Sequence, residues 1–102
     1  MRKKKILRLS RDPSEWVYYR EPNGYSWSPE PGWWRIVGSY RDVSYGMGTG
    51  TFLILSRPDW GSLLHVRFDQ CRPANTVKDF RELEETVGRL ERYINDDYRT
   101  KT

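Results

Sequence analysis

The sequence predicts a small, mainly β fold with one C-terminal helix (α+β): an antiparallel five-stranded sheet, closed as a barrel or curled, plus one amphipathic helix. Three observations predict it. A glycine-rich stretch runs into a continuous apolar segment at 52–55, which has the length of a strand rather than a helix. After a turn that contains Pro58 and Gly61, residues 64–68 alternate as in a hairpin, so we expect Leu64, Val66 and Phe68 to point inward and His65 and Arg67 outward. Near the C-terminus, apolar residues return at helical spacing.

Strands are also expected before this hairpin, because aromatic and β-branched side chains gather there. The three expected segments are residues 5–10, 15–20 and 33–40. Between the second and the third lies a loop at 22–32 with three prolines and two glycines, and loops of this length are often functional. Neighbouring strand residues face opposite sides of a sheet, so we expect at most one of Trp33 and Trp34 in the main core.

The last part of the chain predicts a helix over 76–98. Its apolar residues recur three and four positions apart: Phe80, Leu83, Val87, Leu90 and Ile94. Thr76, followed three residues later by Asp79, fits an N-terminal capping pair. The apolar stripe is also a heptad pattern, but it is too short for a free-standing coiled coil. It therefore favours packing on the protein's own sheet, with a weak homodimer through the helix as the alternative.

The length of 102 residues fits a single domain, with a basic arm at 1–5, the β part at 6–70 and the helix at 76–98. The formal net charge is +4, but residues 1–11 contribute +6, which leaves −2 on the rest of the chain. The positive charge therefore belongs to an arm and not to the surface of a basic domain. Such an arm is either a solvated tail or a segment that binds phosphates.

The sequence also bounds the location of the protein. A lone cysteine, Cys71, excludes an intramolecular disulfide and favours a reducing, cytoplasmic compartment. The basic start is followed by only two apolar residues, Ile6 and Leu7, so we expect no export signal. No apolar run approaches the roughly 20 residues that a membrane span needs, so we expect no membrane partner.

The hairpin resembles the small SH3-like barrels of the Tudor and KOW type, including those appended to DNA-repair helicases. Their pattern is a Gly-x-Gly-Thr-Val strand followed by an apolar-x-Val-x-Phe-Asp return. Here Gly-Thr-Gly-Thr-Phe at 48–52 and Leu-His-Val-Arg-Phe-Asp at 64–69 occupy those positions, which with the turn make about a fifth of the chain. Gln-Cys-Arg at 70–72 replaces the family's Asp-x-Gly turn, and the C-terminal helix is extra. The resemblance implies a binding module for nucleic acid, peptides or polymerase-type machines, and only rarely an enzyme.

No residue set predicts catalysis, a metal or a cofactor. His65 and Cys71 are the only histidine and cysteine, too few for a four-ligand zinc site, and no third group is evident to orient a Cys–His pair. The glycines at 46–50 lack the Lys-Ser/Thr and the helix of a phosphate loop. Endoribonuclease toxins of the MazF type share a barrel-plus-helix build and need no histidine. Their Arg-Pro-apolar strand is not matched, because Arg57-Pro58 falls in a turn, so this enzyme is only a weaker alternative.

The surplus of aromatic side chains is the best functional lead. Five tryptophans, seven tyrosines and three phenylalanines exceed what one small core encloses, and arginines are interleaved with them. Exposed rings beside arginine suit base stacking on single strands. They equally suit protein-binding hot spots. In the third interpretation, most of the rings pack under the 22–32 loop as a satellite cluster.

These observations predict a non-enzymatic module that contacts nucleic acid or a nucleoprotein machine, with the basic arm on phosphates. The alternative is a small protein-binding inhibitor or adaptor, of the viral or mobile-element type, that acts on host machinery. An aromatic cage for a methylated lysine is a weaker option. The predicted contact residues are Arg2, Lys3, Lys4, Lys5, Arg8, Tyr25, Trp27, Trp33, Trp34, Arg35, Arg41 and Trp60.

Overall fold

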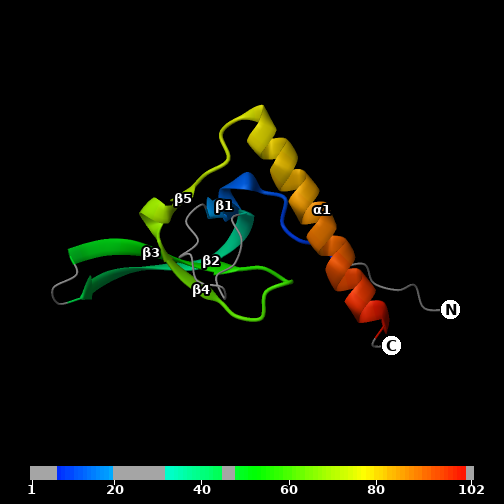
Figure 1. The fold of residues 1–102 in the computed structure, drawn as a ribbon, viewed down its shortest axis with the longest axis horizontal. Helices are drawn as coiled ribbons and strands as arrows, with labels where there is room; N and C mark the ends of the chain where they lie inside the picture. Colours follow the sequence, from blue (N-terminus) through cyan, green and yellow to red (C-terminus); the bar gives the residue numbers. More distant parts are fainter. Residues whose placement is uncertain (1–6, 20–31, 45–47, 101–102) are drawn as a thin grey trace.

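The computed structural model describes residues 7–19, 32–44 and 48–100, which form one antiparallel sheet and one long helix (Figure 1). The strand order is β4-β3-β2-β1-β5, and α1 crosses one side of the sheet (Figure 1). The predicted α+β class is therefore confirmed. The elements in chain order are η1 (Pro13–Glu15), β1 (Trp16–Tyr19), β2 (Gly32–Ser44), β3 (Gly48–Ser56), β4 (Leu64–Arg67), η2 (Phe68–Gln70), β5 (Cys71–Arg72) and α1 (Val77–Thr100).

Strand β2 joins the two parts of the sheet. Residues 32–35 pair with β1, whereas residues 35–44 pair with β3. Between Ile36 and Gly38 the register shifts, and such a bulge increases the local bend and twist of a strand. A Cβ at Gly38 would lie 3.3 Å from Ile54 Cδ1, so glycine suits the close approach of β3 at this point. β4 and β5 end the strand order, and closure into a barrel stays a prediction.

An inner core fills one face of the sheet. Its buried residues come from four strands, and they are Val17, Tyr19, Trp34, Leu53, Leu55 and Val66. Along β3 these residues alternate with outward-facing ones, as the predicted hairpin requires. The sequence also placed Phe68 inward, and this is wrong. The strand ends at Arg67 and the chain turns into η2, which leaves Phe68 60% exposed.

An outer core lies between α1 and the other face of β1 and β2. It consists of Trp16, Trp33, Leu83, Val87 and Leu90, with Leu9, Tyr18 and Ala74 packed against it. The middle of the predicted helical stripe therefore packs on the protein's own sheet, as expected. Phe80, at the start of the stripe, is 44% exposed. A homodimer through α1 stays a prediction.

The start of α1 is capped as the sequence predicted. Thr76 Oγ1 accepts a hydrogen bond from the Asp79 amide at 3.0 Å. Asp79 is itself buried, and its Oδ2 accepts from Arg72 Nη1 at 2.9 Å and from the Asn75 amide at 3.2 Å. The helix thus begins at Val77, one residue after the predicted start, and continues to Thr100, two residues beyond the predicted end.

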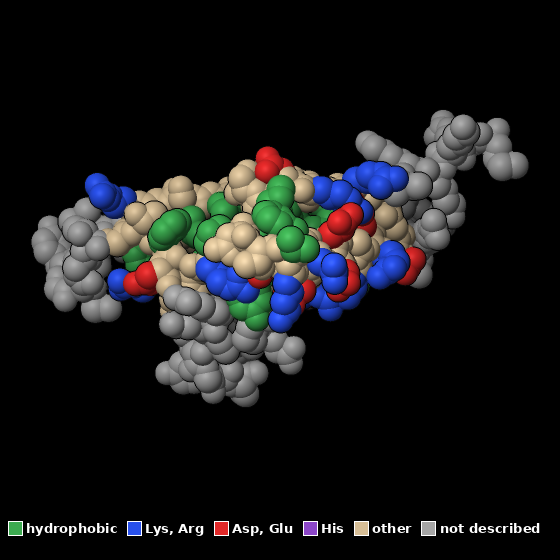
Figure 2. Space-filling view, turned by 90° about the horizontal axis from the view of Figure 1, so that it is seen from above, with side chains coloured by type: hydrophobic (Ala, Val, Ile, Leu, Met, Phe, Trp, Pro, Cys, Tyr) green, Lys and Arg blue, Asp and Glu red, His purple; other side chains and the backbone are tan. Residues whose placement is uncertain are grey.

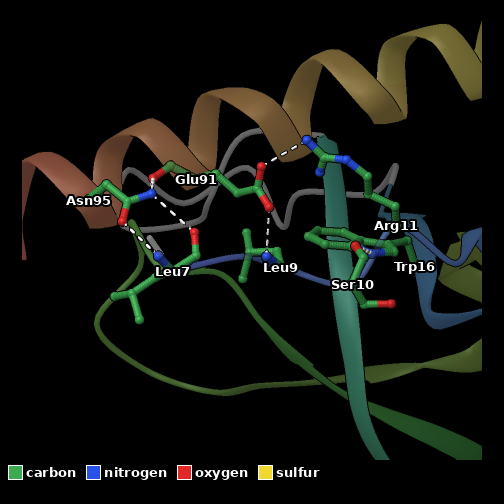
Figure 3. A network of polar contacts seen from close by, with 7 residues as sticks. All are labelled: Leu7, Leu9, Ser10, Arg11, Trp16, Glu91 and Asn95. Atoms are coloured by element: carbon green, nitrogen blue, oxygen red, sulfur yellow. Dashed lines mark hydrogen bonds and ion pairs between the residues drawn. The ribbon is translucent and has the colours of Figure 1, made fainter. Parts of the chain in front are cut away.

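The predicted strand at 5–10 is wrong for its described part. Residues 7–10 pair with no strand and instead lie along α1 (Figure 3). The amide side chain of Asn95 forms the two backbone hydrogen bonds that a neighbouring strand would form, because it both donates and accepts hydrogen bonds. Its Oδ1 accepts from the Leu7 amide at 2.9 Å, and its Nδ2 donates to the Leu7 carbonyl at 3.0 Å.

One helical turn earlier, Glu91 holds the same segment (Figure 3). Its Oε2 accepts from the Leu9 amide at 2.7 Å, and its Oε1 accepts from Arg11 Nη2 at 2.8 Å. Trp16 Nε1 donates to the carbonyl of Ser10 at 3.0 Å. We call residues 7–11 the strap. Side chains of α1 bond the backbone of Leu7 and Leu9 where a neighbouring strand would otherwise do so, and strand propensity does not predict such contacts.

Candidate functional site

The outer face of the sheet has two halves. α1 covers the half that β1 and the start of β2 form, where Trp16, Tyr18 and Trp33 lie. The other half comes from β2, β3 and β4, and in Figure 1 it extends away from α1. On this second half the side chains of Tyr40, His65 and Arg67 are exposed.

Rings gather on this uncovered half. The outer aromatic face, as we call it, consists of Tyr40, Phe52, His65 and Arg67. Tyr40 pairs with Phe52 across β2 and β3, and Phe52 pairs with Arg67 across β3 and β4. The rings of Tyr40 and Phe52 stack with centroids 5.3 Å apart and planes 8° apart.

His65 completes this group at its edge. Its ring centroid lies 5.7 Å from that of Tyr40, and Tyr40 Oη is 3.2 Å from His65 Nδ1. Tyr40 is 37% exposed, His65 and Arg67 are exposed, and Phe52 is half-buried. The stack thus rests on the outer face of the sheet, and its Tyr40 ring is in contact with solvent.

The alternation of the hairpin explains why these side chains face outward. Phe52 neighbours the buried Leu53, and His65 and Arg67 flank the buried Val66. Because successive strand residues point to opposite faces, each buried position fixes an outward one beside it. Cross-strand pairing then brings the outward rings within contact distance.

Arg67 gives the outer aromatic face a positive group. Its Nε lies 3.3 Å from Asp69 Oδ1, and the two side chains are 51% and 68% exposed. An exposed ion pair of this kind contributes little stability. A guanidinium has five N–H donors, so the contact with Asp69 does not prevent Arg67 from binding an anion.

Trp33 and Trp34 do not lie on a contact face, and that part of the predicted site is wrong. They are only 2% and 1% exposed, because both faces of the β1–β2 pair are covered. Each indole has an arginine of this chain beside it. Arg57 Cζ lies 4.9 Å from the Trp34 ring centroid, and Arg72 Cζ lies 5.5 Å from that of Trp33.

Aspartates hold both of these arginines. The hydrogen bond from Arg72 is the main cause that lowers the pKa of Asp79 to about 2, although desolvation opposes it. Burial acts to raise the pKa of Asp59, but the hydrogen bonds and charge of Arg57 outweigh it, so this pKa is also lowered. Two of the arginines that the sequence interleaves with aromatic residues, Arg57 and Arg72, therefore contact aspartate and tryptophan side chains of this same chain.

The other described members of the predicted site are scattered. Trp60 is half-buried against the inner core, edge-on to Trp34 with centroids 6.1 Å apart. Arg35 is partly exposed and lies 3.5 Å from a Glu15 oxygen. Arg41 is exposed, but it follows Tyr40 in β2 and so faces the opposite side of the ribbon.

The remaining predicted residues belong to the N-terminal segment and the long loop. Arg8 is exposed on the strap. The others lie outside the described residues, and they are Arg2, Lys3, Lys4, Lys5, Tyr25 and Trp27. The predicted 22–32 loop also lies outside them, except for its last residue, Gly32.

Sequence reasoning missed Phe52, His65 and Arg67 as binding residues, and it treated Tyr40 only as one of many rings. The alternation at 64–67 did place His65 and Arg67 outward together. What the sequence does not show is the pairing register of β2, β3 and β4. Only pairing across three strands shows that Tyr40, Phe52 and Arg67 lie in one row.

The outer aromatic face offers two stacked rings, an imidazole and a guanidinium. Within residues 7–19, 32–44 and 48–100, no group of three or more His, Cys, Asp or Glu side chains is placed to hold a metal ion. α1, the one long helix of the described part, is not apolar enough to cross a membrane. The face in Figure 2 carries hydrophobic patches with both basic and acidic side chains around them, so it is not a uniformly basic surface.

Comparison with known proteins does not assign the chain to a family. No family model matches it, and no curated protein or solved structure does either. The fold and the site thus define a small α+β protein with one open, ring-bearing sheet face. The resemblance to SH3-like barrels stays a prediction that rests on residues 48–52 and 64–69.

Proposed function

We propose that this protein is a non-enzymatic module that binds single-stranded nucleic acid through the outer aromatic face. The observation that carries the proposal is the nearly parallel stack of the exposed Tyr40 on the half-buried Phe52, beside the exposed His65 and Arg67. Unpaired bases stack on such rings, and each base contributes about 1–3 kcal/mol. Bases in a duplex present only their edges, so the stack favours single strands.

The basic N-terminal arm supports the same proposal through charge. Arg2, Lys3, Lys4 and Lys5 add four positive charges ahead of the strap. The strap itself is held by Glu91 and Asn95 in the second half of α1 (Figure 3). The β2–β3 ribbon lies on the other side of the molecule (Figure 1). We therefore assign base stacking to the ribbon and electrostatic attraction to the arm, as separate contributions.

The test is binding of fluorescently labelled oligonucleotides across a salt series. Tyr40→Ala weakens binding about tenfold or more, because a stacking surface is lost, while the salt dependence is unchanged. Tyr40→Phe keeps the ring and binds nearly as well as the natural protein. Arg67→Ala reduces the slope of log K against log salt by about 0.7, the value for one phosphate contact on a single strand.

The matched control is Tyr93→Ala, which removes a tyrosine that is 51% exposed on α1, away from the ribbon. It leaves the affinity unchanged. Deletion of residues 1–5 lowers the salt slope by up to about 3, because four cations are lost. Equal effects of Tyr40→Ala and Tyr93→Ala, or no oligonucleotide binding at low salt, would overturn the proposal.

A further inference from the structure

The β2–β3 ribbon leaves one stretch of sheet edge open. β3 pairs with β2 along its whole length, from Gly48 to Ser56. On its other side β3 pairs with β4 only at 52–55, because β4 ends at Arg67 and the chain continues into η2, which lies against β3 without pairing with it as a strand. Residues 48–51 of β3 therefore have no strand partner on that side among the described residues.

The backbone groups along an open sheet edge determine which kind of ligand can form hydrogen bonds with it. An antiparallel strand directs alternate N–H donors and C=O acceptors outward, and these match the backbone of another strand. A nucleic-acid backbone offers mainly acceptors at its phosphates, so it does not match this pattern. The open edge of β3 thus favours an extended polypeptide.

A hollow lies at the same place. It is lined by Gly50, Thr51, Arg67, Phe68 and Asp69 and has a volume of about 250 Å³. Small-molecule pockets usually measure about 300–1,000 Å³, so this hollow suits a peptide side chain better than a whole ligand. Phe68 is 60% exposed at its wall and offers an apolar contact.

From these observations we propose that an extended peptide segment of a partner protein adds as a strand to the 48–51 edge of β3, with one apolar side chain against Phe68. Backbone pairing would supply affinity and the hollow would supply side-chain preference, as in other cases of strand addition. This site adjoins the outer aromatic face, since Arg67 belongs to both, but the inference rests on the open edge of β3 and does not depend on nucleic-acid binding.

The experiment uses the full chain and a synthetic probe. The probe is a peptide of about eight residues with alternating valine and threonine and a lysine at each end. Amide hydrogen exchange is measured with and without the peptide. The expected result is slower exchange within residues 48–51. A second peptide with the same side chains, but with alternate backbone amides N-methylated, cannot donate those hydrogen bonds and gives no protection.

Two variants locate the side-chain contact. Phe68→Ala weakens peptide binding about tenfold, as expected for an interface anchor, and Phe68→Leu restores most of the affinity. Leu63→Ala is the control, because Leu63 is 56% exposed in the β3–β4 turn and does not line the hollow. Equal binding of the N-methylated peptide, protection elsewhere, or protection of 48–51 by self-association alone would overturn the proposal.

Discussion

Trp33 and Trp34 are neighbours in β2, yet they lie in two separate hydrophobic cores. Trp34 belongs to the inner core, and Trp33 packs against α1 in the outer core. Because adjacent strand residues face opposite sides, this arrangement requires that both faces of the β1–β2 pair be covered. The strand pair is therefore the wall between the two cores, and α1 stabilises the side that a single sheet would leave exposed.

Separate cores predict a specific pattern of energetic coupling. Trp33→Leu and Val87→Ala both alter the outer core, so their effects on the free energy of unfolding differ from additivity by about 0.5–3 kcal/mol. Trp34→Leu and Val87→Ala alter different cores and add within about 0.5 kcal/mol. Urea denaturation of the single and double variants measures both values. Equal coupling in the two pairs would contradict the division into two cores.

The Arg72–Asp79 ion pair predicts a dependence of stability on pH. Asp79 has a pKa of about 2 in the folded protein, below its ordinary value of 3.8, chiefly through its hydrogen bond with Arg72. A lowered pKa stabilises the fold fully above about pH 4, and this contribution is lost as the pH falls from about 4 to about 2.

Replacement of that carboxylate tests this dependence. Asp79→Asn lowers stability at neutral pH and flattens the profile of unfolding free energy between about pH 4 and pH 2. Denaturant titrations at several pH values measure it. Asp96→Asn, at an exposed position of α1, is the control and keeps the acid dependence of the natural protein. An unchanged slope in Asp79→Asn would show that the ion pair does not contribute.

The strap predicts that two neighbouring truncations differ sharply. Removal of residues 1–6 leaves the contacts of Leu7, Leu9 and Arg11 with α1 in place, so stability changes little. Removal of residues 1–11 takes away both partners of Glu91, a buried carboxylate at 7% exposure. The truncation loses two hydrogen bonds to this carboxylate, each worth about 1.5–3 kcal/mol, and the packing of Leu9 against the outer core. Thermal and denaturant unfolding measure the difference, and equal stabilities of the two truncations would disprove the role of the strap.

We expect replacement of Trp60 to lower the stability of the protein but not its affinity for oligonucleotides. It is half-buried against the inner core and edge-on to Trp34. Full burial of a tryptophan is worth about 3–5 kcal/mol by alanine substitution, so we expect about 2 kcal/mol for Trp60→Ala. Oligonucleotide affinity stays unchanged, because Trp60 is not part of the outer aromatic face. A stable variant that loses binding would return Trp60 to the contact surface.

The periodicity of apolar residues was sufficient to predict the elements in which that periodicity is strong. Spacings of three and four residues predicted α1, and alternation after the Pro58 turn predicted the return strand that begins at Leu64. These patterns are local, since a helix or a strand repeats its faces within a few residues. The strap lacks such a signal, because its partners, Glu91 and Asn95, lie more than 80 positions away.

The candidate site depended on information that no single segment contains. The sequence showed that His65 and Arg67 share one side of a strand, but not that Tyr40 and Phe52 stack beside them. It also counted the tryptophans as a surplus, because it predicted that the helix packs on the sheet but not that this packing buries Trp16 and Trp33.

By itself, then, the sequence determined the α+β class, the C-terminal helix with its capped start, and the outward direction of His65 and Arg67. Tertiary structure alone decided which rings are buried, which rings stack in the open, and where a sheet edge is left without a partner. The physical reason is that side-chain direction follows from local backbone geometry. Burial instead depends on which distant element covers each face.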